Sequence, residues 1–264
     1  MDTLTLGKNN PRLADIRRAL NGDTLTDDGL LPVEGPRLIR EAQNSGLVVA
    51  ALFVRSDVST NGMGEGVPTY TLDQPAFRKI QTTESSQGLI ALVRVKASTV
   101  AEIVSKMEAG PAVVLAQLQD PGNAGTILRV AESFGASGCI GLTNTVALYN
   151  PKVVRASAGS VFRLPCTWNV SLQDAASELH AAGVSIVGTS PHAAQSIDQW
   201  DWRTKTAILI GNEGSGLNPP DLELCDAVLR IPLRPPVESL NSAIAASVIL
   251  YESFKQRGLT GGFQ

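Results

Sequence analysis

The residues with the clearest potential for chemistry are Asn123 and Arg129, six positions apart in the segment LQDPGNAGTILRVAESFGASGCIGL, residues 118–142. We expect Asn123 to cap a helix, because its side chain can accept a hydrogen bond from an unpaired backbone N–H. Arg129 lies off the apolar face of this helix, so both side chains could reach the carboxyl edge of a parallel sheet, where ligands bind. An ordinary strand-turn-helix unit with a surface arginine fits the same residues. The predicted apolar face consists of Ile127, Val130, Ala131 and Phe134, and Gly135 ends the helix.

A glycine-rich loop, LIGNEGSGL at 209–217, directly follows an apolar strand. Its glycines surround Asn212 and Glu213 and allow a ligand to approach backbone N–H and C=O groups closely. The loop lacks the lysine and Ser/Thr of a phosphate-binding loop, and its spacing does not match the dinucleotide-binding fingerprint. A tight connection and a binding loop both remain possible.

A third segment, IPLRPPVESLNSAIAASVILYE at 231–252, combines prolines with Ser239 and Asn241. The prolines exclude regular structure, and the two polar residues can cap the helix that follows. This helix is apolar almost all round, so it must be buried on several sides. It could be a core helix of one subunit, but we favour packing against a second copy of the chain.

The elements around these segments predict two α/β domains. After Pro111, apolar runs alternate with helical stretches, which indicates a parallel sheet with crossover helices; its strands are expected at 113–117, 138–142, 185–189, 207–210 and 227–231. The first part contains expected helices at 11–20, after Glu34 and near 75–82, and expected strands at 47–54 and 89–95. A helix is expected over 99–110. We therefore predict domains at 1–100 and 111–264, joined by a linker at 101–110.

The composition favours a protein without a membrane or metal partner. The chain has 264 residues, 43% of them hydrophobic and 18% charged. Its longest apolar run, 47–54, is too short for a membrane-spanning helix. The first residues do not resemble a secretory signal, so we expect a cytoplasmic protein. Three separated cysteines and two histidines predict neither a disulfide framework nor a metal site.

Basic residues gather in the first domain although the formal net charge is −3. A negative total disfavours a protein that coats nucleic acid by bulk electrostatics. The cluster could contact the phosphates of a nucleic acid, and such contacts would read position and shape more than base identity. A solvated helix face is the alternative. The predicted phosphate-binding residues are Arg12, Arg17, Arg18 and Arg37.

The three segments, in this order, resemble the signature motifs of the SpoU/TrmH-type RNA 2′-O-ribose methyltransferases of the SPOUT class. NAGTILR is similar to the first motif, GNEGSGL to the second, and IPL with ESLN to the third. NPKVVRASAGSVFRLP at 150–165 also matches the style of the family. In the first domain, NPRLADIRRAL, EGPRLI and QGLIAL are similar to the small substrate-binding domain of many members.

The resemblance implies an α/β protein with a C-terminal parallel-sheet domain tied in a trefoil knot and a smaller N-terminal RNA-binding domain. It also implies a homodimer and S-adenosyl-L-methionine as the methyl donor. The departure from the family pattern is Arg234, Pro235 and Pro236, where a glycine is usual. The implied donor-binding residues are Thr189, Gly188, Gly211, Ile231 and Leu240. The implied reaction-site residues are Asn123, Arg129, Glu213, Ser239 and Asn241.

The expected reaction is methyl transfer to a ribose 2′-hydroxyl of structured RNA. The hydroxyl must lose its proton during or soon after transfer. Because arginine stays protonated, we expect Arg129 to bind the adjacent phosphate and hydroxyl while a phosphate oxygen or water takes the proton. Glu213 could orient Arg129 or an arginine of a second subunit such as Arg155.

Ribosomal RNA is the favoured substrate, and transfer RNA is an alternative. A catalytically silent RNA-binding or assembly protein with the same fold is a second alternative. A nucleotide-cofactor oxidoreductase is disfavoured, because the chain lacks G-x-G-x-x-G.

Overall fold

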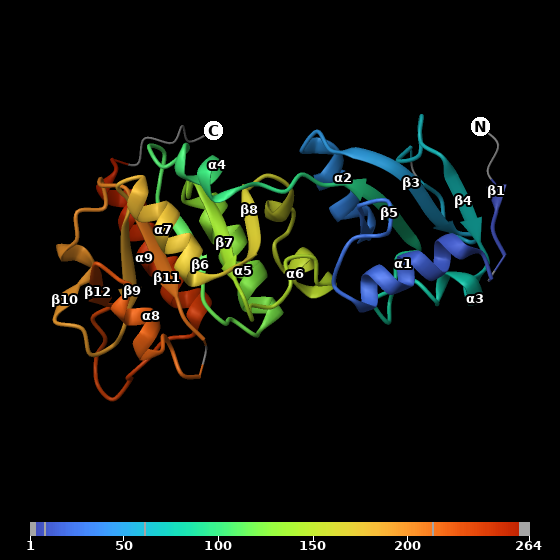
Figure 1. Ribbon diagram of the computed structural model, residues 1–264. Helices are drawn as coiled ribbons and strands as arrows, with labels where there is room; N and C mark the ends of the chain where they lie inside the picture. The colour runs from blue at the N-terminus through green and yellow to red at the C-terminus, as the bar shows by residue number, and fades with distance from the viewer. Residues whose placement is uncertain (1–3, 8, 61, 213, 259–264) are drawn as a thin grey trace. The chain divides into compact units, whose positions relative to one another are not determined.

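The chain forms two compact units in the computed structural model, which describes residues 4–7, 9–60, 62–212 and 214–258 (Figure 1). The first unit contains the described residues up to Lys96 and the segment Ala147–Phe162. The second contains Ala97–Val146 and the described residues from Arg163 onward. No helix in the described ranges is long and apolar enough to cross a membrane.

The first unit is built on a five-stranded mixed sheet of order β1-β4-β3-β5-β2. Strand β5 pairs antiparallel with β2 and β3, whereas β4 runs parallel to β3 and β1. The strands are β1 (Leu4–Thr5), β2 (Leu30–Glu34), β3 (Val48–Arg55), β4 (Thr69–Leu72) and β5 (Leu89–Arg94).

Helices cover both faces of this sheet. Alternate residues of β5 point to opposite faces, so the residues that pack against them show which helix lies on which face. Ile90 shares one core cluster with Leu13 of α1 (Pro11–Asn21) and with α3 (Gln74–Phe77). Its neighbour Leu89 shares the other cluster with Ile39 of α2 (Pro36–Asn44). Helices α1 and α2 therefore lie on opposite faces of the sheet.

The segment Ala147–Phe162 belongs to the first unit although β7 and β8 of the second unit flank it. It contains α6 (Pro151–Ala156) and the short 3-10 helix η1 (Ser160–Phe162), and Val154 packs into the core beside α2. Arg155 Nη1 donates to Thr82 Oγ1 at 2.9 Å, and Thr82 N donates to Glu34 Oε2 at 2.7 Å. Polar and apolar contacts thus hold a chain crossover against the first unit.

The second unit is a seven-stranded sheet of order β10-β12-β9-β11-β6-β7-β8, and every strand pair is parallel. The predicted strands at 138–142 and 185–189 have the observed bounds of β7 and β9. The strand expected at 113–117 ends earlier, since Gln117 adopts a positive φ of 54°. The strands are β6 (Ala112–Leu115), β7 (Gly138–Leu142), β8 (Cys166–Val170), β9 (Ser185–Thr189), β10 (Gln195–Ser196), β11 (Thr206–Ile210) and β12 (Ala227–Arg230).

Two helix layers enclose this sheet. Helices α4 (Val100–Val104) and α7 (Leu172–Ala181) share a core cluster with Val114 of β6 and Leu209 of β11. The intervening strand residues point the other way, toward the layer of α5 (Pro121–Ser133) and α9 (Ser242–Gln256). The remaining elements of this unit are η2 (Ile197–Gln199) and α8 (Pro219–Glu223).

The stretch predicted as a linker, 101–110, is part of the second unit. It holds most of α4, and Ile103 and Met107 are buried in the core cluster. The helix expected over 99–110 is also shorter, because its C-cap is Ser105 and turns follow. The predicted division at 100–111 therefore differs from the observed units, both here and at Ala147–Phe162.

Candidate functional site

A cavity of about 250 Å³ lies where β9, β11 and β12 reach their carboxyl ends. This is the edge at which open parallel α/β sheets bind ligands. Three separate stretches supply its wall: the end of β9, the glycine loop after β11 and the stretch from β12 into the first turn of α9. The lining residues are Thr189, Ser190, Pro191, Ile210, Gly211, Asn212, Gly214, Ser215, Gly216, Leu229, Ile231, Leu233, Glu238, Ser239, Leu240, Ser242 and Ala245.

Asn212 fixes the glycine loop. Its Oδ1 accepts from Gly214 N at 2.9 Å, and its Nδ2 donates to Gln117 O at 2.9 Å. Its backbone also pairs with Gly216 in both directions, at 3.1 and 3.0 Å. A Cβ at Gly211 would lie 2.4 Å from the carbonyl carbon of Gly216, so only glycine fits there. The side-chain and backbone bonds together hold a narrow loop against the cavity.

Asn241 joins the third motif to the first. Its Oδ1 caps α9 by accepting from Ala243 N at 2.9 Å and Ile244 N at 3.3 Å. Its Nδ2 donates to Asn123 Oδ1 at 3.0 Å. Since Phe134 near the end of α5 contacts Tyr251 near the end of α9, the two helices run parallel. Their amino ends meet beside the cavity wall formed by Ser239, Leu240 and Ser242.

The prediction that Asn123 caps its helix is wrong. The cap of α5 is Asp120, whose Oδ1 accepts from Asn123 N at 2.7 Å. The helix begins earlier because Pro121 is favoured at the first helical position and Asp120 is a good cap. The side chain of Asn123 instead contacts Asn241.

Arg129 lies on the exposed stripe of α5 and is not among the residues that line the cavity. Its guanidinium makes no hydrogen bond or ion pair with the part of the chain that the structure describes. Glu213, which we expected beside it, lies outside the described residues. The structure therefore brings Asn123 and Asn241 together but shows no contact between either of them and Arg129.

Four of the five expected donor-binding residues line the cavity: Thr189, Gly211, Ile231 and Leu240. Ser239, expected at the reaction site, lines it as well. Gly188 does not. A Cβ there would lie 2.8 Å from Cys225 Sγ, so this glycine allows close packing behind the strand.

Ser242 and Glu238 line the cavity although the sequence did not single them out. Ser242 is buried, and its Oγ has no hydrogen-bond partner among the described residues. Both residues lie within three positions of Asn241 or Ser239, and that proximity was the available signal. Glu238 lies in an irregular segment and Ser242 is the first residue of α9, so neither position has a periodic pattern before it from which to deduce its direction.

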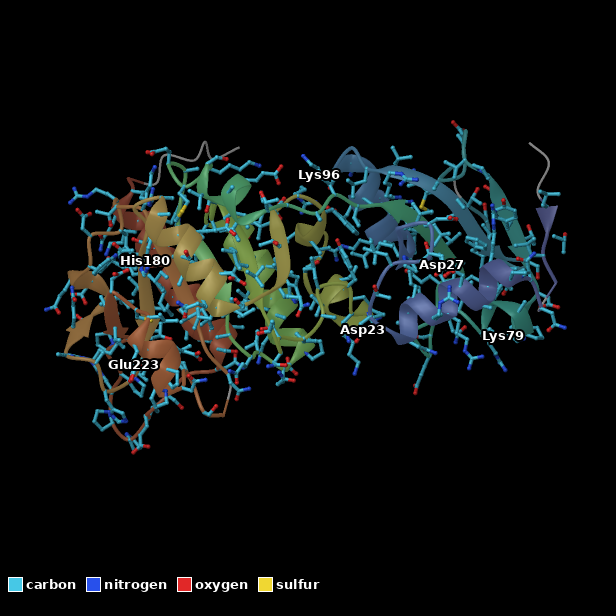
Figure 2. All side chains as sticks on the ribbon, viewed as in Figure 1. Asp23, Asp27, Lys79, Lys96, His180 and Glu223 are labelled. Atoms are coloured by element: carbon cyan, nitrogen blue, oxygen red, sulfur yellow. The ribbon has the colours of Figure 1, made fainter. Side chains whose placement is uncertain are left out.

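The four basic residues expected to bind RNA occupy different surroundings in the first unit. Arg12 donates to the hydroxyl of Tyr70, and its guanidinium carbon lies 5.1 Å from the ring centroid. Arg18 contacts Asp27, labelled in Figure 2, and Asp15 at 2.7 Å. The hydrogen bond to Asp27 has the largest effect on the pKa of Arg18. Both carboxylates raise this pKa, and they offset the charge of the guanidinium.

Arg17 and Arg37 are exposed, and neither makes an ion pair within the described ranges. Arg17 lies on α1 and Arg37 on α2, and these helices cover opposite faces of the sheet. The structure therefore does not gather the four arginines on one helix layer.

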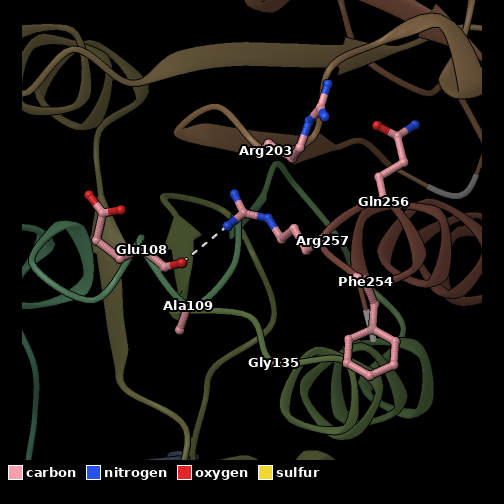
Figure 3. Close-up of a pocket in the computed structure, with 8 residues that line it drawn as sticks. Glu108, Ala109, Gly135, Arg203, Phe254, Gln256 and Arg257 are labelled. Atoms are coloured by element: carbon pink, nitrogen blue, oxygen red, sulfur yellow. Dashed lines mark hydrogen bonds between the residues drawn. The ribbon is translucent and has the colours of Figure 1, made fainter. Parts of the chain in front are cut away.

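A larger cavity of about 600 Å³ lies near the amino ends of β6, β7 and β11 (Figure 3). Arg257 lines it and donates to the carbonyl oxygens of Glu108 at 3.2 Å and Thr204 at 3.0 Å. Burial lowers the pKa of Arg257. Gln256 Nε2 donates to Glu252 at 3.0 Å, while its Oε1 accepts from Trp202 N at 3.2 Å. These side chains tie the end of α9 to neighbouring loops, and we assign no ligand to this cavity.

A family model matches most of the second unit, and relatives in other organisms match nearly the whole chain. The model of the SpoU rRNA Methylase family matches residues 110–251. An uncharacterized tRNA/rRNA methyltransferase of Synechocystis sp. is 32% identical over 255 residues, covering 94% of this chain and 92% of the relative. The 23S rRNA (guanosine(2553)-2′-O)-methyltransferase RlmP of Bacillus subtilis is 28% identical over 243 residues, covering 92% and 95%.

A solved structure agrees with these matches. The SpoU methyltransferase AviRb from Streptomyces viridochromogenes, in complex with the cofactor AdoMet, has a TM-score of 0.83 and 30% identity, covering 96% of this chain and 100% of that one. The family model spans the glycine loop, the Asn241 segment and α5, which are the parts that form or adjoin the smaller cavity. The chain belongs to the SpoU rRNA methylase family.

Proposed function

We propose that this chain transfers a methyl group from S-adenosylmethionine to a ribose 2′-hydroxyl of ribosomal RNA. The observation that carries the proposal is the cavity at the carboxyl edge of the second sheet. The end of β9, the glycine loop and the third motif segment line it, and the Asn123–Asn241 hydrogen bond ties that third segment to the first motif. The curated relative RlmP is named as a 23S rRNA 2′-O-methyltransferase, which supports ribosomal RNA and the ribose hydroxyl.

The cavity suits a nucleoside sulfonium. Ile210, Leu229 and Leu240 offer apolar walls for a purine, while the glycine loop exposes backbone polar groups. Ser242 Oγ, buried without a partner in the described chain, can donate to or accept from a bound molecule after rotation about one bond. When bound there, S-adenosylmethionine supplies an electrophilic methyl group.

Arg129 is proposed to bind the RNA at the reacting nucleotide. Its guanidinium is exposed and can donate to a phosphate oxygen and the ribose hydroxyl together. A phosphate oxygen or a water molecule then takes the hydroxyl proton, because arginine stays protonated. Asn123 and Asn241 hold the amino ends of α5 and α9 in position, and Glu213 is proposed to orient Arg129. Much of the rate would come from this positioning.

The first unit is proposed to bind structured RNA through its arginines. Arg17 and Arg37, exposed and without ion pairs in the described part, are the stronger candidates for phosphate contacts. Arg12 and Arg18 are proposed to contribute less, because Tyr70 and two carboxylates engage them.

A homodimer is proposed on the basis of an apolar stripe on α9. Ile244, Val248 and Tyr251 have exposed fractions of 52%, 36% and 51%, and their spacing of four and three places them on one side of the helix. Such a stripe is typical of an interface. Light scattering should give twice the chain mass, and Ile244→Glu with Val248→Glu should give a monomer; a monomeric unaltered chain would contradict the dimer.

We also propose that the loops around the smaller cavity form the trefoil knot implied by the family resemblance.

Methyl transfer in vitro tests the function. Purified protein, S-adenosylmethionine labelled at the methyl group, and unmodified ribosomal or transfer RNA would be incubated together, and the RNA would be hydrolysed in alkali. A 2′-O-methyl group blocks cleavage, so label in alkali-resistant dinucleotides from ribosomal RNA supports the proposal. Label only from transfer RNA corrects the substrate, and label only in mononucleotides corrects the acceptor atom. Absence of label from both RNAs favours a silent RNA-binding protein.

A further inference from the structure

Glu238 is the one ionisable residue among the described residues that line the smaller cavity. The other lining residues are apolar, glycine, hydroxyl-bearing or, at Asn212, an amide. Glu238 is exposed and makes no ion pair or hydrogen bond within the described ranges. A negative charge thus stands at the wall of an otherwise neutral site, and no cationic side chain among the described residues pairs with it.

The reaction changes the charge of the molecule that this cavity is proposed to hold. A sulfonium loses its methyl group to the ribose oxygen, and the sulfur keeps the electron pair of the broken bond as a neutral thioether. The purine, the ribose and the amino-acid groups stay the same. Apolar walls and neutral hydrogen-bonding groups therefore contact the donor and the product alike, but a carboxylate attracts more strongly the form that carries the additional positive charge.

We propose that Glu238 makes the cavity prefer the sulfonium donor over the thioether product. The inference rests on the proposed function, since it assigns a residue to selectivity at that same site. Glu238 would act as a specificity-determining residue. Its charge would attract the donor strongly before transfer and the product more weakly afterwards.

The helix beside the cavity gives this charge a second role. Ser242 and Ala245 of α9 line the wall, and α9 is a helix of 15 residues whose amino end carries a partial positive charge. That end attracts a carboxylate but opposes a cation. Glu238 lies three positions before the cap Asn241, so its charge offsets the opposition near the wall.

The exposure of Glu238 limits the size of the effect. Solvent screens opposite charges at a surface, and such pairs change affinity by up to about fivefold. The preference should weaken as salt rises, because the Debye length falls from about 10 Å at 0.1 M to about 3 Å at 1 M. A neutral hydrogen bond would not show this salt dependence.

Calorimetric titration of Glu238→Gln tests the inference without a turnover assay. The ligands are S-adenosylmethionine, S-adenosylhomocysteine, and sinefungin, which carries an amine in place of the methylsulfonium. Glutamine keeps the size and polarity of the side chain and removes its charge. Glu223→Gln is the matched control, because Glu223 is exposed on α8, outside the cavity lining (labelled in Figure 2).

We expect Glu238→Gln to weaken the two positively charged ligands about fivefold and the thioether less than twofold, at low salt. The control should bind all three as the unaltered chain does. Equal weakening of donor and product, or no change in either, overturns the inference while leaving the proposed function in place. If the unaltered chain binds neither donor nor product, the proposed function itself fails, and the inference fails with it.

Discussion

Asn241 Nδ2 donates to Asn123 Oδ1 at 3.0 Å, which joins the amino ends of two parallel helices across 118 positions of the chain. Asn241 also caps α9, so one side chain both starts this helix and ties it to α5. Residues of the segment around Asn241 line the cavity. The position of that wall therefore depends on a single amide group.

Asn241→Ala should lower the free energy of unfolding more than Asn241→Ser does. Serine keeps a good cap but is too short to reach Asn123, whereas alanine loses both interactions. The cap is worth about 1 kcal/mol and the side-chain hydrogen bond about another 1 kcal/mol. Urea denaturation measures both variants. Equal losses for the two would show that the cap adds no stability, and an unaltered stability of Asn241→Ser would show that the link to Asn123 adds none.

Gly211→Ala should strongly weaken donor binding, because the added Cβ would lie 2.4 Å from the carbonyl carbon of Gly216. Gly214→Ala is the matched control in the same loop, since the atom nearest to its added Cβ would be Asn212 Oδ1 at 3.5 Å, an ordinary contact distance. Calorimetry with S-adenosylmethionine should show a loss of at least about tenfold in affinity for the first variant and a small change for the second. Normal binding by Gly211→Ala would refute the role of this loop.

Charge reversal of Arg17 and Arg37, one at a time, should weaken RNA binding. Each phosphate contact that is lost should reduce the slope of log affinity against log salt by about 1. Arg18→Ala should change binding less, because Asp15 and Asp27 already offset that charge. Filter binding over a range of salt concentrations measures the slopes. Unchanged slopes for both reversals would exclude the first unit as the phosphate-binding surface.

Stability should decline at alkaline pH because burial raises the pKa of Cys166 to about 12 and of Cys225 to about 11, from an ordinary value of 9.0. Between about pH 9 and these values the unfolded chain loses thiol protons that the folded chain keeps. The free energy of unfolding therefore falls as pH rises through this window. Cys166→Ala should show a shallower decline in urea titrations from pH 8 to 11. An unchanged decline would contradict the assignment.

Regular apolar patterns made much of the second sheet predictable. The bounds of β7 and β9 follow from short buried runs of the kind that parallel sheets require. Strand β8 escaped prediction, because Thr167 and Asn169 interrupt its apolar pattern. Asn169 adopts a positive φ of 62°, and the pairing register shifts beside it.

Contacts between distant residues were not predictable from local patterns. The pairing of Asn123 with Asn241 depends on how two crossover helices pack. Likewise, Arg155 contacts Thr82 only because the crossover segment folds with the first unit. Local propensity carries no information about such pairings.

The most direct test is a map of ribose 2′-O-methylation in ribosomal RNA from cells with and without this protein. We predict a methylated position that disappears without the protein and returns with the unaltered chain. Arg129→Ala should fail to restore it while still folding and binding S-adenosylmethionine. Identical maps with and without the protein would contradict methylation of ribosomal RNA, and restoration by Arg129→Ala would contradict the role of that arginine.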